Sequence, residues 1–201
     1  MPRLPRVLSS RDLPLAELQA AQLDGELCRV GELWCAIDEP DGFVVRATSL
    51  GLSWPKRYIA ERRSAAWVWG ALDMPPLAHD LCASLGARTR PQPGARVNMR
   101  EVSIDSTEIV EIGGLLVTTP LRTMTDLARF AGMADGEALW LMRRLSVDFA
   151  LAYKQCRSAI DAPRNLPNVR LARRRIDATF DLDPQAVPSA RCRDRYPELT
   201  R

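Results

Sequence analysis

The chain has 201 residues, 46% of them hydrophobic, and a formal net charge of +3 from 28 basic and 25 acidic residues. This length holds one domain or two small ones with a buried core, and this composition excludes wholesale disorder. The stretch Met1–Arg6 lacks the apolar core of a signal peptide, and the longest apolar run, Ala65–Leu72, is too short for a membrane span. We therefore expect a cytoplasmic protein with no membrane contact.

The cysteines and the single histidine give no obvious metal or acid–base centre. The five cysteines are scattered without a Cys-x-x-Cys pair, which makes a structural zinc site unexpected. We expect them to be small apolar residues held as thiols in a reducing compartment. His79 is the one histidine, and no serine lies in a Gly-x-Ser-x-Gly turn. The expectation is a protein that is not an enzyme and uses no cofactor or metal.

The first elements are predicted to be a helix and a hairpin. The helix covers 15–23 and ends at Asp24-Gly25, where glycine suits the residue after a helix. Two strands, 28–30 and 33–37, follow around the turn Gly31-Glu32. A helix followed by a hairpin is how a winged helix ends. Because so little chain precedes the helix, the module is expected to be shortened.

The middle of the chain changes from helices to strands at Pro75-Pro76. Before this point helices are predicted over 44–52 and over 64–72, the second capped by Ser64. After it, strands are predicted over 80–85, 96–104 with a bulge near Arg100-Glu101, 108–112 and 115–117. Helices follow over 120–131, 135–145, 147–160 and 168–180.

These elements indicate an α+β fold in three parts. A small winged-helix-like helix–hairpin module is expected over 1–74. A mixed α/β domain with a mainly helical C-terminal part is expected over 75–183. The remaining residues, 184–201, are expected to be a loosely ordered tail.

The most distinctive stretch is Gly113–Arg129. Gly113-Gly114 can adopt the positive φ angles of a two-residue hairpin loop, and Thr119 can cap a helix whose first residue is Pro120. Its Val-Thr-Thr-Pro-x-Arg-Thr-x-x-Asp-Leu-Ala pattern resembles the signature of the AbiEi family of antitoxins, from type IV toxin–antitoxin systems of actinobacteria. Ser64–Gly70 resembles that family's Ser-Ala-Ala-x-x-x-Gly helix, and Ala16–Val30 resembles the end of its N-terminal winged-helix segment.

The resemblance implies an antitoxin that counters a nucleotidyltransferase-type toxin encoded next door and binds operator DNA to repress their shared operon. It also implies that neutralisation need not require a stable complex with the toxin. Some relatives continue into a nuclease-like domain, but this chain has no Glu-x-Lys or Asp-x-Lys for such a metal site. The competing interpretation is a protein-interaction module of this family that does not bind DNA.

Candidate DNA-binding residues fall into an N-terminal group and two basic clusters. In the first, Gln19 and Gln22 could contact base edges, and Arg11 and Arg29 the backbone. The first basic cluster is Lys56, Arg57, Arg62 and Arg63, and the second is Arg170, Arg173 and Arg174. A solvated face is the alternative for both clusters. Because phosphate neutralisation dominates affinity, we expect the anionic contact at the basic clusters rather than at the N-terminal helix, which carries no basic residue.

Two further pairings are predicted from helical spacing. Arg122 and Asp126, four residues apart, are expected to form an exposed ion pair. Arg173 can pair with Asp177 at the same spacing. The N-terminus of the helix at Pro120 could also hold a phosphate, but Thr119 is fully explained as its cap.

Overall fold

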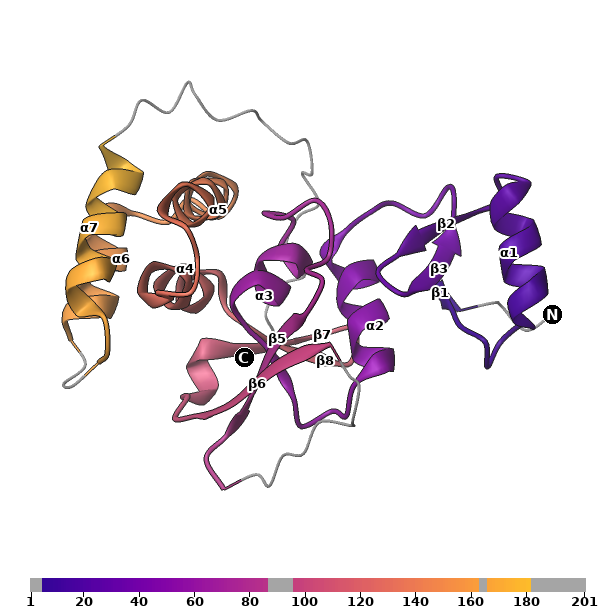
Figure 1. The fold of residues 1–201 in the computed structure, drawn as a ribbon, viewed down its shortest axis with the longest axis horizontal. Coiled ribbons are helices and arrows are strands. Elements are labelled where there is room, and N and C mark those ends of the chain that lie inside the picture. Colours follow the sequence, from indigo (N-terminus) through magenta and orange to yellow (C-terminus); the bar gives the residue numbers. More distant parts are fainter. Residues whose placement is uncertain (1–4, 87–95, 163–165, 182–201) are drawn as a thin grey trace.

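The computed structural model describes residues 5–86, 96–162 and 166–181. They form an α+β fold in which a small sheet lies at one end, a larger sheet at the centre and four helices at the other end (Figure 1). The tail expected over 184–201 lies outside the described residues. None of the helices in the described ranges combines the length and apolar character needed to cross a membrane.

The N-terminal module consists of one helix on a three-stranded antiparallel sheet (Figure 1). Helix α1 (Leu15–Leu23) is followed by β2 (Leu27–Val30) and β3 (Leu33–Ala36), which confirms the predicted helix and hairpin. Strand β1 (Val7–Leu8) was not predicted, because two residues carry no periodicity, and it pairs with β3. A small core of Leu8, Leu18 and Trp34 holds α1 on the sheet.

The central sheet has five strands in the order β6-β5-β4-β8-β7. It is mixed: β4 pairs antiparallel with β5 and parallel with β8, β5 pairs parallel with β6, and β7 pairs antiparallel with β8. The strands are β4 (Ile59–Ala60), β5 (His79–Ser84), β6 (Val97–Val102), β7 (Ile109–Ile112) and β8 (Leu115–Thr118). The middle strand, β4, precedes Pro75-Pro76, so residues on both sides of the expected boundary build one sheet and one core.

The bulge predicted near Arg100 is absent, and this prediction was wrong. Strand β6 pairs with β5 in unbroken register from His79↔Val97 to Ser84↔Val102. The change of polar and apolar phase in the sequence has another cause. Arg100 and buried Val102 are two residues apart in the strand and therefore face the same side of the sheet. A charged side chain is tolerated on that side because carboxylates neutralise it.

Helices α2 (Phe43–Ser53) and α3 (Arg62–Val68) join the small sheet to the large one. Helix α3 begins earlier and ends earlier than predicted, and Ser64 does not cap it, because Glu61 occupies the N-cap position. Instead Ser64 is fully buried, and its Oγ accepts a hydrogen bond of 2.9 Å from the backbone N–H of Asp80. The serine therefore fixes α3 against β5.

The C-terminal part is helical, as predicted, but one helix was placed wrongly. The helices are α4 (Pro120–Arg129), α5 (Asp135–Asp148), α6 (Tyr153–Asp161) and α7 (Val169–Phe180), and the short 3₁₀ turn η1 (Ser106–Glu108) precedes β7. Instead of a helix over 147–160, α5 continues to Asp148 and the chain reverses at Ala150, which has a φ of +50°. No glycine or proline marks this reversal, and the edge-to-face contact of Phe149 with Trp69 at 5.3 Å accompanies it.

The stretch Gly113–Arg129 folds as predicted. Gly113 and Gly114 have φ angles of +55° and +82° in the turn between β7 and β8. Thr119 is the N-cap of α4, and its side chain accepts a hydrogen bond of 3.3 Å from the backbone N–H of Arg122. Local turn and cap chemistry therefore determines this segment.

Replacing Thr119 should test that cap. Thr119→Ala removes the acceptor of the Arg122 N–H and should lower the free energy of unfolding by about 1 kcal/mol in urea titration. Thr119→Ser, which keeps the hydroxyl, should retain most of that stability. An equal loss in both variants would show that the methyl group and not the cap is responsible.

Candidate nucleic-acid interface

Two of the predicted N-terminal site residues meet at one tryptophan. The indole Nε1–H of Trp34 donates a hydrogen bond of 2.8 Å to Oε1 of Gln22. The guanidinium carbon of Arg29 lies 4.2 Å from the centroid of the Trp34 ring, and Arg29 and Trp34 are opposite each other in the β2–β3 hairpin. Trp34 is 5% exposed and belongs to the small core under α1. Trp34 therefore holds Gln22 of the helix and Arg29 of the sheet in place from the core side.

This contact also orients the amide of Gln22. An indole N–H can only donate, so the carbonyl oxygen of Gln22 faces Trp34 and its NH₂ group remains free to donate elsewhere. Arg29 is exposed, and among the described residues its guanidinium has no hydrogen-bond partner. The cluster thus presents two kinds of donor, an amide and a planar cation, held by the same aromatic ring.

The other two predicted N-terminal site residues, Arg11 and Gln19, do not join this cluster. The side chains of Arg11 and Gln19 form no hydrogen bond or ion pair with any other described residue. The surrounding module is acidic: between Pro5 and Asp41 eight acidic residues outnumber three basic ones. This charge opposes the approach of phosphate.

The first basic cluster divides into two parts. Lys56 and Arg57 are exposed in the turn after α2, with Arg57 against the ring of Tyr58. Arg63 instead makes two hydrogen bonds of 3.0 Å to the carboxylate of Glu137 on α5. Arg62 lies over the ring of Phe130, 4.2 Å from its centroid. These two arginines attach α3 to the helical part of the molecule.

The second basic cluster lies on the outer face of α7, as predicted, and acidic residues already pair with most of it. Arg173 pairs at 2.9 Å with Asp161 and not with Asp177, which is held by Arg157 on α6. Arg174 pairs with Asp135 at 2.6 Å. Among the described residues, Arg170 has no ion-pair partner.

The N-terminal group and the α7 cluster lie at opposite ends of the molecule, with the central sheet between them (Figure 1). The structure therefore brings together Gln22 and Arg29 through Trp34, but it does not join them to the arginines of α7. Sequence reasoning missed Trp34 as their support, although its position opposite Arg29 follows from the predicted hairpin register.

Arg122 and Asp126 form the predicted ion pair, but the prediction that this pair is exposed was wrong, because it belongs to a network around buried carboxylates. Asp126 is only 3% exposed, and its carboxylate accepts a hydrogen bond of 2.9 Å from Nε of Arg122. Arg100 makes two hydrogen bonds to the buried carboxylate of Glu61 and lies 3.5 Å from Asp126. Arg122 also reaches Glu108. Burial by itself lowers the pKa of Arg100, but these carboxylates outweigh it and raise that pKa above its usual range.

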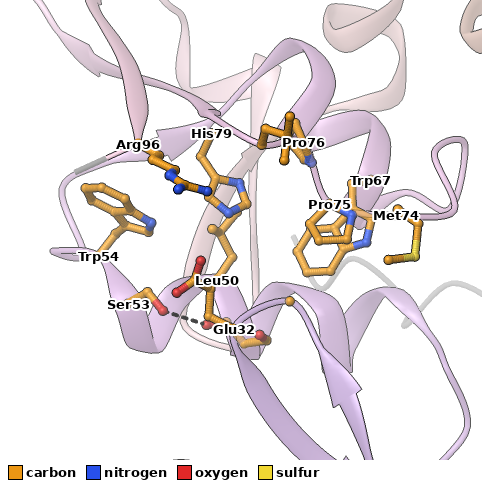
Figure 2. Close-up of a pocket in the computed structure, with 13 residues that line it drawn as sticks. Glu32, Leu50, Ser53, Trp54, Trp67, Met74, Pro75, Pro76, His79 and Arg96 are labelled. Atoms are coloured by element: carbon orange, nitrogen blue, oxygen red, sulfur yellow. Dashed lines mark hydrogen bonds between the residues drawn. The ribbon is translucent and has the colours of Figure 1, made fainter. Parts of the chain in front are cut away.

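A pocket of about 690 Å³ lies between the hairpin turn and the central sheet (Figure 2). Glu32 of the turn, Trp54 after α2 and Trp67 of α3 line it. His79 of β5 and Arg96, just before β6, border it on the side of the sheet. The Ser64 hydroxyl accepts from the backbone N–H of Asp80 and lies 3.1 Å from Nδ1 of His79. When Ser64 donates in this contact, neutral His79 carries its proton on Nε2.

Burial lowers the pKa of His79 from its usual 6.5, and Glu32 and Asp80 partly oppose this. His79 is therefore mostly neutral at pH 7. Across residues 5–86, 96–162 and 166–181, no group of three or more His, Cys, Asp or Glu side chains is arranged to hold a metal ion.

The comparisons with known proteins give one distant likeness in structure to report. No family model matches the chain, and no curated protein matches it. The crystal structure of the RV2827C protein from Mycobacterium tuberculosis is similar with a TM-score of 0.48 and 15% sequence identity, over 90% of this chain and 74% of that chain.

Asp126→Asn should destabilise the protein by about 3 kcal/mol, because it removes the buried carboxylate that Arg122 and Arg100 share, while Glu108 still faces Arg122. Urea unfolding measures this. The matched control is Glu39→Gln in the surface pair of Glu39 with Arg6, which should cost less than about 1 kcal/mol. Equal effects in the two variants would contradict a dependence on the buried network.

Acidification should destabilise the fold through His79. Because its folded pKa is lowered, the unfolded chain binds a proton at pH values where the folded chain does not. This contribution to stability is complete well above pH 6.5. It is lost as the pH falls from 6.5 towards the lowered pKa of the folded chain, by at most about 1.4 kcal/mol per pH unit for one proton. The chain has one histidine, so the difference between the unmodified protein and His79→Asn isolates the effect. A pH-independent difference would refute it.

Proposed function

We propose that this chain is a DNA-binding antitoxin of the AbiEi type, which represses its own operon and counters a nucleotidyltransferase-type toxin. The observation that carries the proposal is the contact of Trp34 with both Gln22 and Arg29. It prepares two donors at the junction of a helix and a hairpin, the parts with which winged helices contact DNA. The resemblance of Gly113–Arg129 to the family signature supports the same proposal.

The orientation of Gln22 limits what it can recognise. A glutamine that reads adenine uses its oxygen and its NH₂ group together. Here the oxygen already accepts from Trp34, so Gln22 has donors to offer and would prefer acceptors such as guanine O6 and N7 or thymine O4. Arg29 can bind a phosphate or the same guanine edge.

The charge of the module sets the expected affinity. Between Pro5 and Asp41 the chain has eight acidic residues and only three arginines, so this module can neutralise few phosphates. We expect weak binding that is lost as salt is raised. On α7, Arg173 and Arg174 are paired with aspartates, which moves the proposed contact to the N-terminal module.

Titration of a fragment of the upstream operon DNA at several salt concentrations tests the proposal. Arg29→Ala should weaken binding to all sequences and reduce the salt slope by about one. Gln22→Glu keeps the acceptor for Trp34 but has no N–H to donate, so it should abolish sequence preference. Gln19→Glu adds the same charge on the same helix and serves as the matched control. Reversing Arg173 and Arg174 to glutamate should leave binding unchanged.

Two results would overturn this assignment. Loss of binding on reversal of Arg173 and Arg174, with no effect of Arg29→Ala, would place the DNA on α7. Absence of binding even at low salt would favour the second candidate function, a protein-interaction module.

The second candidate function rests on its own observation. The acidic N-terminal module exposes Leu15 and Leu23 on α1, at 51% and 89%, and such a surface suits a basic protein better than DNA. Co-expression with the neighbouring toxin gene, followed by size-exclusion chromatography at low and high salt, would measure direct contact with the proposed partner.

A further inference from the structure

Two cysteines face each other across the β2–β3 hairpin. Cys28 and Cys35 are register partners, and their Sγ atoms are 3.2 Å apart. Both are free thiols, with Cys35 buried and Cys28 partly exposed. A disulfide requires a separation of about 2.05 Å, so the sulfur atoms need to approach by little more than 1 Å.

The backbone at this pair is compatible with a bond. The N–H of Ile37 donates to the carbonyl of Glu26, and hydrogen-bonded pairs alternate along antiparallel strands. Cys28 and Cys35 therefore form a hydrogen-bonded pair, with Cα atoms about 5.5 Å apart. Disulfides span Cα separations of about 4.4–6.8 Å, so the hairpin can be bridged without changing its register.

We propose that Cys28 and Cys35 are a reversible thiol–disulfide site that responds to low-molecular-weight disulfides. The thiolate of Cys28, the more accessible of the two, attacks the small disulfide and forms a mixed disulfide, releasing one small thiol. Cys35 then attacks the sulfur of Cys28, forms the Cys28–Cys35 bond and releases the second small thiol. Two protein thiols lose two electrons and two protons, and the small disulfide gains them.

The surroundings of Cys35 make its step the slow one. Burial, together with the neighbouring Cys28 and the acidic Asp41 and Glu39, raises the pKa of Cys35 to about 12. Since the thiolate is the attacking species, closure of the disulfide accelerates as the pH rises. A bond across one hairpin restricts only a short loop, which favours a site that opens again when thiols are restored.

Equilibration of the full chain in buffers of reduced and oxidised glutathione tests the proposal. Cys192 lies outside the described residues, so Cys192→Ser is used as the background, which leaves four cysteines. Alkylation and mass spectrometry should show the loss of two thiols per monomer and a linkage of Cys28 to Cys35. Cys82 and Cys156, which are completely buried, should remain thiols, and dithiothreitol should restore all four.

Single variants separate the two steps. Cys35→Ser should accumulate a glutathione adduct on Cys28, and Cys28→Ser should form neither an adduct nor a bond, because Cys35 is buried. Four thiols at every glutathione ratio, a permanent adduct in the background protein, or a bond between two chains would each overturn the proposal. The thiol count of the background protein decides the question even if a variant fails to fold.

Discussion

Arg100 and the two carboxylates beside it connect the parts of the fold. Glu61 follows the middle strand β4, Arg100 lies on the edge strand β6, and Asp126 lies on α4. A carboxylate removed from water is costly unless a cation and hydrogen bonds compensate it, so each of these side chains requires the others in place. The network thereby fixes the edge strand, the middle strand and α4 relative to one another. The stretch Gly113–Arg129 supplies Asp126 and Arg122, so these polar residues act in folding.

Elsewhere in the fold, buried arginines bind the backbone at helix ends. Arg175 of α7 donates to three backbone carbonyls at and just beyond the end of α4, and Arg46 of α2 donates to two carbonyls at and beyond the end of α3. Arg144 of α5 donates to the carbonyl of Gly70 in the same region. The last carbonyls of a helix lack partners within it, and the guanidinium has enough donors to satisfy several of them. These three arginines therefore stabilise helix ends inside the fold and are not available to contact an external partner.

The β2–β3 hairpin carries different chemistry on its two faces. Successive side chains of a strand point to opposite sides, so Arg29 and Trp34 lie towards α1 while Cys28 and Cys35 lie on the side of the main core. Its turn, Gly31-Glu32, borders the pocket of Figure 2. A bond between the cysteines would brace the strands that hold the proposed DNA contact. The redox site and the DNA contact remain separate proposals, because each rests on different atoms.

The sequence by itself determined the elements that local chemistry specifies. These include the helix capped by Thr119, the glycine turn before it, the N-terminal helix and hairpin, and the α+β class. The strand register about the turn Gly31-Glu32 already places Cys28 opposite Cys35 and Arg29 opposite Trp34. These pairings follow from counting residues outward from the turn, not from composition or from a sequence motif. Only the tertiary structure decided the two-residue strands β1 and β4, the reversal at Ala150 and the partners of Asp126 and Arg173. Turns, caps and periodicity act between neighbours in the chain, whereas a short strand or a buried charge is stable only when distant segments supply its hydrogen bonds and counter-charges.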